Sequence, residues 1–142
     1  MIRFFSRQSL LGFAALFSMM CVSHTMQAQN IAAGNLSLDI GGAYVLNGEG
    51  NSTGSSVAAG TTLTGFVSVD GVGGPGGTVT VSCGDYFTGG TIFTWSTERA
   101  AGVSFTWTPT TAGIHQLYCS GTWRSAHVNG TVTTGTAYIP VT

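Results

Sequence analysis

Apolar and polar residues alternate with a period of two along several short stretches of this chain, which is the pattern of half-buried β-strands. The clearest stretch is 103–107 (VSFTW), in which three apolar side chains share one face while serine and threonine share the other. No segment carries apolar residues at helical spacing over the length of a helix, so the sequence predicts essentially no helix. Similar alternation covers 36–40, 63–69, 79–83, 115–119 and 137–141.

Turns rich in glycine and proline separate these stretches. They are GVGGPGG at 71–77, Gly89-Gly90, and PTTAG at 109–113, and such residues punctuate short strands. Asn129-Gly130 predicts a two-residue hairpin turn, because such turns favour residues that tolerate positive φ. About seven short strands favour an all-β fold, an immunoglobulin-like antiparallel β-sandwich. Residues 29–60 are expected to form a loosely ordered N-terminal strand and a Gly/Ser-rich loop.

The first residues have the features of a cleaved signal peptide. Arg3 and Arg7 precede an apolar run from Leu10 to Val22, which is shorter than the roughly 20 residues of a membrane-spanning helix and typical of a signal sequence. Cleavage after Ala28 would divide the chain into a signal peptide, 1–28, and one β-sandwich domain, 29–142. The sequence therefore predicts an exported protein, periplasmic or extracellular, without membrane insertion after cleavage.

Two cysteines remain once the signal peptide, which contains Cys21, is removed. Cys83 and Cys119 both lie on the apolar side of their predicted strands. An even pair of cysteines in an oxidising compartment favours a disulfide bond. We therefore predict that Cys83 and Cys119 are bonded to each other rather than present as two reactive thiols.

Charge is scarce, and its scarcity argues against several classes of partner. Only 6% of the residues are charged, against about a quarter in an average soluble protein, and none is lysine. Four arginines against five acidic residues provide no basic surface for a phosphate backbone, so the sequence predicts no nucleic-acid binding. The hydrophobic share of 43% is high enough to supply a folded core.

Residues 61–119 resemble bacterial immunoglobulin-like modules of the CARDB (cell-adhesion-related) type. The resemblance rests on the strand TTLTGFVSVD, a Gly-rich turn and the string VSFTWTPTTAGIHQLYC. In such modules an alternating strand, here containing Phe105, ends in W-x-P, and the following short turn ends in glycine. Trp107, Pro109 and Gly113 occupy those positions. The resemblance implies an immunoglobulin-like fold and a binding or adhesion role, without catalytic residues.

Motifs that carry chemistry are few. The spacing of Cys83 and Cys119 is shorter than in the inter-sheet disulfide of true immunoglobulin domains, which leaves open a bridge between neighbouring strands of one sheet. His115 and Cys119 share a face and could form a metal site or an activated thiol, but a buried, hydrogen-bonded histidine is favoured. Asp70 and Asp85 flank turns, and a turn-forming role is favoured over calcium binding. The acidic residues are scattered and no nucleophile motif is present, so we predict no enzyme, cofactor or metal site.

Aromatic residues are the remaining candidates for a ligand surface, because flat rings stack on sugars and a neighbouring arginine donates hydrogen bonds. The alternative is that they simply cover the open ends of a small sandwich. The predicted function is an exported, non-enzymatic binding or adhesion module for a protein or glycan ligand. A self-associating structural subunit of a pilus, surface layer or matrix and a carbohydrate-binding module stay open as alternatives. The candidate ligand residues are Tyr86, Phe87, Tyr118, Trp123 and Arg124.

Overall fold

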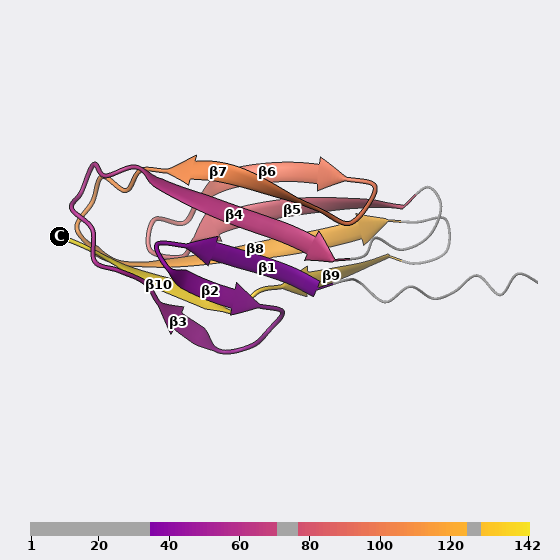
Figure 1. Ribbon diagram of the computed structural model, residues 1–142, viewed down its shortest axis with the longest axis horizontal. Helices are drawn as coiled ribbons and strands as arrows, with labels where there is room; N and C mark the ends of the chain where they lie inside the picture. The colour runs from indigo at the N-terminus through magenta and orange to yellow at the C-terminus, as the bar shows by residue number, and fades with distance from the viewer. Residues whose placement is uncertain (1–34, 71–76, 125–128) are drawn as a thin grey trace, which may run out of the picture.

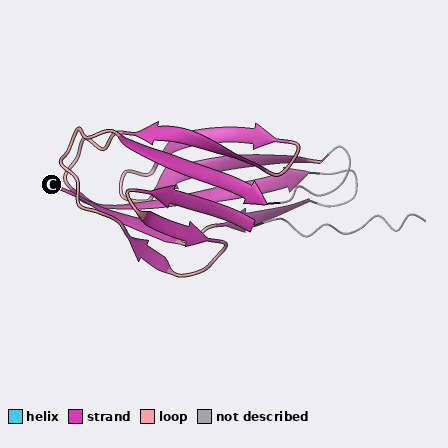
Figure 2. Ribbon diagram, in the orientation of Figure 1, coloured by secondary structure: helices cyan, strands magenta, loops and turns pink. Residues whose placement is uncertain are grey.

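The computed structural model describes residues 35–70, 77–124 and 129–142, and these residues form ten β-strands and no helix (Figures 1 and 2). The predicted signal peptide, most of the turn at 71–77 and residues 125–128 lie outside the described residues. The strands are β1 (Asn35–Ile40), β2 (Ala43–Leu46), β3 (Asn51–Thr53), β4 (Leu63–Asp70), β5 (Thr78–Asp85), β6 (Gly90–Thr97), β7 (Ala101–Trp107), β8 (Gly113–Arg124), β9 (Asn129–Thr133) and β10 (Thr136–Val141).

The strands form two sheets, whose strands run along the long axis of the molecule (Figure 1). One sheet has the order β2-β1-β4-β7, and the other has the order β3-β10-β8-β5-β6, with β9 paired to β8. All pairs are antiparallel except β3 with β10. β1, β4 and β7 hold the places of strands A, B and E of the immunoglobulin fold, and β10, β8, β5 and β6 hold those of G, F, C and C′. The expected all-β sandwich is therefore confirmed.

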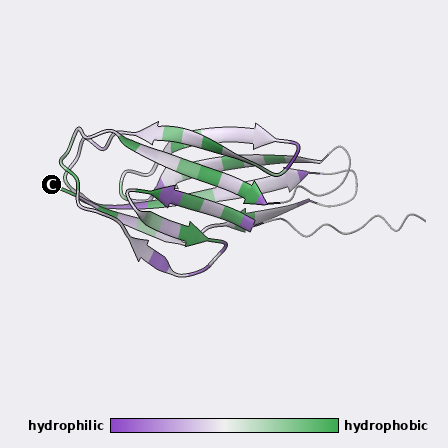
Figure 3. Cartoon of the chain, viewed as in Figure 1, coloured by the Kyte–Doolittle hydropathy of each residue, from purple (hydrophilic) through white to green (hydrophobic). Residues whose placement is uncertain are grey.

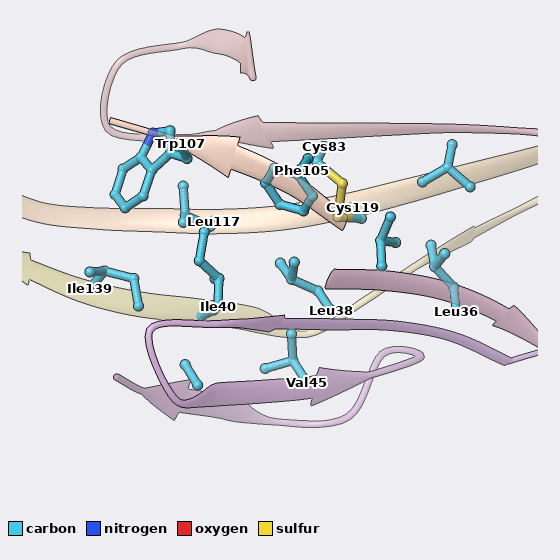
Figure 4. Close-up of a cluster of buried hydrophobic side chains, with 14 of the residues drawn as sticks. Leu36, Leu38, Ile40, Val45, Cys83, Phe105, Trp107, Leu117, Cys119 and Ile139 are labelled. Carbon is cyan, nitrogen blue, oxygen red and sulfur yellow. A yellow bond between two sulfur atoms is a disulfide. The ribbon is translucent and has the colours of Figure 1, made fainter. Parts of the chain in front are cut away.

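The core lies between the two sheets, because each strand turns its apolar residues inward. Bands of apolar and polar residues follow one another along the strands (Figure 3), and the apolar side chains of both sheets meet around the disulfide (Figure 4). Phe105 and Trp107 of β7 are 6% and 7% exposed, and Pro109 is buried beyond them. The other buried hydrophobic residues include Leu36, Leu38, Ile40, Ala43, Val45, Val67, Val69, Val79, Val81, Leu117, Ala137, Ile139 and Val141.

The described part of 29–60 is more ordered than its composition indicates. Gly41 and Gly42 adopt positive φ of 58° and 77°, which allows β1 and β2 to form a tight hairpin. β3 then adds to the edge of the other sheet, parallel to β10, and Val57 bridges to Val141. The segment therefore connects both sheets. Its Gly/Ser-rich composition predicts a loop. The strand β3 forms there because β10 supplies backbone hydrogen-bond partners, which composition does not reveal.

Two further departures from the sequence prediction have local causes. The alternation of β6 is broken by a bulge opposite Cys83 and Gly84, and this irregular pattern hides the strand from a search for period two. Asn129 and Gly130 are not a hairpin turn but the first residues of β9. Gly130 has no positive φ, and its missing side chain instead leaves room for the indole ring of Trp123.

Cys83 and Cys119 are directly opposite each other on β5 and β8 and form a disulfide between neighbouring strands of one sheet. Both side chains are fully buried. Because a shift of one residue would turn a cysteine to the opposite face of the sheet, the bond holds these two strands in register. The half-buried Phe93 of β6 lies next to it and stacks on Phe105, with ring centroids 4.9 Å apart.

Replacing both cysteines with alanine is expected to lower the free energy of unfolding by about 2–5 kcal/mol, because the unfolded chain gains entropy when positions 36 residues apart are no longer linked. Urea unfolding without reductant measures this. The matched control replaces Ser82 and Ser120, the next opposed pair along the same strands on the outer face. Equal stability of the two double variants would contradict a stabilising bond.

Trp107→Ala is expected to cost about 3–5 kcal/mol of unfolding free energy, because the ring is buried at the end of β7 against His115. Thr106→Ser should cost less than about 1 kcal/mol, because Thr106 is exposed on the other face of the strand. Chemical denaturation monitored by circular dichroism distinguishes the two. Similar costs for both variants would refute the alternation of this strand.

Candidate functional site

The most unusual polar feature of the interior is an ion pair between Asp85, at the end of β5, and His115 of β8. His115 Nδ1 lies 2.6 Å from Asp85 Oδ2, and both side chains are 1% exposed. His115 Nε2 lies 2.8 Å from the carbonyl oxygen of Thr111. The carbonyl oxygen of Thr111 can only accept, so Nε2 carries a hydrogen and donates it, while Nδ1 faces the carboxylate of Asp85. The structure thus contains the buried, hydrogen-bonded histidine that the sequence favours, together with a partner that the sequence does not indicate.

The carboxylate of Asp85 organises the turn that follows β5. Its Oδ1 accepts hydrogen bonds from the backbone N–H groups of Phe87 (2.9 Å) and Gln116 (3.0 Å). Its Oδ2 accepts one from the hydroxyl of Thr88 (3.2 Å) in addition to that from His115. The N–H of Gly89 closes the turn on the carbonyl oxygen of Asp85 at 2.8 Å. Four donors therefore surround this buried charge, which satisfies it and fixes the turn at 86–89.

The pair of Asp85 and His115 is built for structure rather than for catalysis. A histidine that acts as a general base needs a free ring nitrogen facing a nucleophile or water, whereas Nε2 of His115 is bonded to a backbone carbonyl. Cys119, the thiol considered with His115, is bonded to Cys83. Among the residues that the structure describes, no group of three or more His, Cys, Asp or Glu side chains could hold a metal ion.

The turn at 86–89 presents two aromatic rings. Tyr86 is 57% exposed and stacks on Tyr118 of β8, with ring centroids 4.0 Å apart and planes at 13°. Tyr118 lies over Gly84, where a Cβ atom would come within 3.0–3.2 Å of its phenol group. Phe87 turns the other way, against the ring of His115 at 4.6 Å. The Tyr86–Tyr118 stack thus stands on the outer face of the six-stranded sheet, and Phe87 covers the buried pair.

Neighbouring residues extend the stack into a surface that we call the tyrosine patch. Gln116 is joined to Tyr86 by a backbone hydrogen bond of 2.9 Å and is opposite Tyr138 of β10. Ile114, two residues before Gln116 on the same face, is 55% exposed. The patch therefore lies across the ends of β5, β8 and β10 and carries no charged side chain. It consists of Tyr86, Ile114, Gln116, Tyr118 and Tyr138.

A second surface, the hydroxyl array, continues the same face along β5 and β8. Eight serine and threonine residues lie in two rows across four neighbouring strands, each opposite the next. Six are exposed and two are half-buried. Within the first row, Thr80 Oγ1 and Ser96 Oγ are 3.0 Å apart, which is hydrogen-bonding distance. The rows are Ser96, Thr80, Thr122 and Thr131, and Thr94, Ser82, Ser120 and Thr133.

The five predicted ligand residues do not form one surface. Tyr86 and Tyr118 are in contact, but Phe87 lies at the end of the sandwich and Trp123 faces inward, half-buried against the core. Arg124 is on the outer face, but it is six residues along β8 from Tyr118, about 20 Å away. Sequence proximity groups Trp123 with Arg124, whereas the strand turns them to opposite faces. Tyr138, Gln116 and Ile114 were missed because Tyr86 reaches them from another segment of the chain, the turn after β5.

The chain matches no protein-family model and no curated protein sequence. Within the described residues, no helix has the length and apolar character needed to cross a membrane.

Asp85→Ala is expected to destabilise the protein by about 3–5 kcal/mol, because it leaves the ring of His115 and two backbone N–H groups buried without their hydrogen-bond partner. Asp39→Ala is the matched control, since Asp39 is exposed on the outer face of β1 and should change stability by no more than about 0.5 kcal/mol. Urea unfolding curves compare them. An Asp85 variant as stable as the control would contradict the role assigned to the pair.

Proposed function

We propose that this chain is an exported, non-enzymatic, immunoglobulin-like binding module of the CARDB adhesion type, which contacts a ligand on a surface through the outer face of its six-stranded sheet. The observation that carries the proposal is the Tyr86–Tyr118 stack, which remains open to solvent although the turn beneath it is fixed by a buried ion pair. The disulfide and the sequence features of a signal peptide support export.

The exposure of the patch and the fixed position of Tyr86 support a binding role. Apolar surface that is left exposed in a small domain is often an interaction site. Tyr86 is held by its turn and by Tyr118, so little conformational freedom remains for a ligand to remove, and such preorganisation favours binding. The buried histidine has no free ring nitrogen, which supports a module that binds without chemical conversion.

A second candidate, a subunit of a self-associating surface assembly, is favoured by the free edges of the sheets. β6 and β7 are the last strands of their sheets, and neither contains lysine, proline or any charged residue. Natural proteins usually protect such edges with these residues, because an open edge can pair with a strand of another chain. Pairing through β6 or β7 would join copies of this protein side by side.

Binding of the purified exported protein to cell-envelope material from the producing cells tests the proposal. Tyr86→Ala should weaken binding by about tenfold or more, because the removed ring is the exposed half of the stack. Tyr44→Ala is the control, since Tyr44 is 56% exposed but lies on the other sheet. Equal binding by wild type and both variants, or no binding by any, would refute the proposal.

Sedimentation of the same protein at high concentration measures self-association and so distinguishes the second candidate function from the first. A monomer contradicts it, whereas assemblies that persist in Tyr86→Ala support it over the first.

A further inference from the structure

We infer that the ligand is an uncharged polysaccharide that lies along β8, with a sugar ring against Tyr86 and its hydroxyl groups hydrogen-bonded to the hydroxyl array. The inference rests on the proposed binding function and adds the chemical class of the ligand and a second half to the site.

The tyrosine patch and the hydroxyl array form one continuous surface. On β5 the array ends at Ser82 and the next outward position is Gly84, which Tyr118 covers. On β8 the outward positions run from Ile114 through Tyr118 to Thr122 without interruption. This distance of eight residues corresponds to about 27 Å of extended strand. The surface is therefore long enough for several sugar units, and a short ligand would use only part of it.

The two halves of the surface match the two sides of a sugar. The exposed ring of Tyr86 provides a flat apolar platform for the C–H face of a pyranose. Serine and threonine hydroxyls both donate and accept hydrogen bonds, as sugar hydroxyls do, and the amide of Gln116 adds two donors and an acceptor. Rows at the spacing of neighbouring strands, about 4.8 Å, repeat this chemistry in a regular pattern across the face.

The lack of basic side chains in the stack and the array selects against acidic ligands. The ten polar and aromatic positions of the stack and the array hold only Tyr, Ser and Thr side chains. On the outward face of β8 the charged residue is Arg124, one outward position beyond Thr122 and at the far end from Tyr86. A single arginine at the rim does not neutralise an acidic polymer that extends over the face. An uncharged polymer needs no such partner.

The composition also favours a glycan over a protein. Serine is depleted at protein–protein interfaces, and serine and threonine are under-represented among the residues that supply binding energy there. Half or more of this surface is made of these two residue types. The opposite sheet offers a contrast, because its exposed aromatic residues Tyr44 and Phe66 flank the carboxylate of Asp39.

The test is affinity electrophoresis of the purified protein in native gels that contain β-glucan, α-glucan, xylan or galactomannan, with alginate and polygalacturonate as acidic polymers. We expect at least one neutral polysaccharide to retard the protein and neither acidic one to do so. Tyr86→Ala should weaken that retardation by about tenfold or more, and Thr122→Val by about threefold or more, since each removes one class of contact. Tyr44→Ala and Thr106→Val, at exposed positions of the other sheet, should leave it unchanged.

Thr122→Val keeps the shape and strand preference of the side chain and removes only its hydroxyl, so loss of binding by this variant is not a folding defect. Retardation by acidic polymers alone, or equal effects of Thr122→Val and Thr106→Val, would overturn the inference. If no gel retards the protein, the producing cells' envelope material is oxidised with periodate, which cleaves sugar diols, before binding is measured. Loss of Tyr86-dependent binding supports a glycan outside the panel.

Binding that survives periodate but is lost after protease treatment of the envelope points to a protein ligand. That outcome overturns the polysaccharide and leaves the proposed binding function standing. Binding that does not depend on Tyr86 overturns both.

Discussion

The buried pair of Asp85 and His115 is the interaction on which the rest of this structure depends. A carboxylate in a dry interior is costly unless its oxygens are satisfied, and here four donors from two segments of the chain, the turn at 86–89 and β8, converge on it. Satisfying that one group fixes the register of β5 against β8, the conformation of the turn at 86–89, and the link of His115 to Thr111. The position of the exposed Tyr86 follows from these contacts, because Tyr86 belongs to the turn that Asp85 holds.

A second constraint lies on the same strands, two residues from Asp85 along β5 and four residues from His115 along β8. The Cys83–Cys119 bond joins β5 and β8 covalently, so the two central strands of the larger sheet are cross-linked once by a disulfide and once by an ion pair, both through the inner face. The outer face of the same strands is therefore held in register without contributing to the core itself. That division lets the protein keep a neutral, hydroxyl-rich surface, because stability comes from the side that water does not reach.

Because inward side chains supply the core, the outward side chains of the same strands are free to form a surface of defined composition, even in a chain with so few charges. The alternation of each strand assigns one side chain to the core and the next to solvent. In β8 the inward residues are His115, Leu117 and Cys119, and the outward ones include Gln116 and Tyr118. The core and the proposed binding surface thus use alternate residues of the same strand, and the aromatic stack lies at the turn that Asp85 holds.

The sequence by itself determined the class of fold and the face on which many side chains lie. Period-two alternation placed Phe105 and Trp107 inward, and the two cysteines on apolar faces indicated their bond. Only the tertiary structure decided which strands are neighbours: that β3 pairs with β10, that Asp85 meets His115, and that Tyr86 joins Tyr118 while Trp123 turns away. The physical reason is that alternation depends on each residue's own backbone, whereas pairing depends on long-range hydrogen bonds and packing between segments. A local sequence pattern therefore contains the alternation but not the pairing of strands.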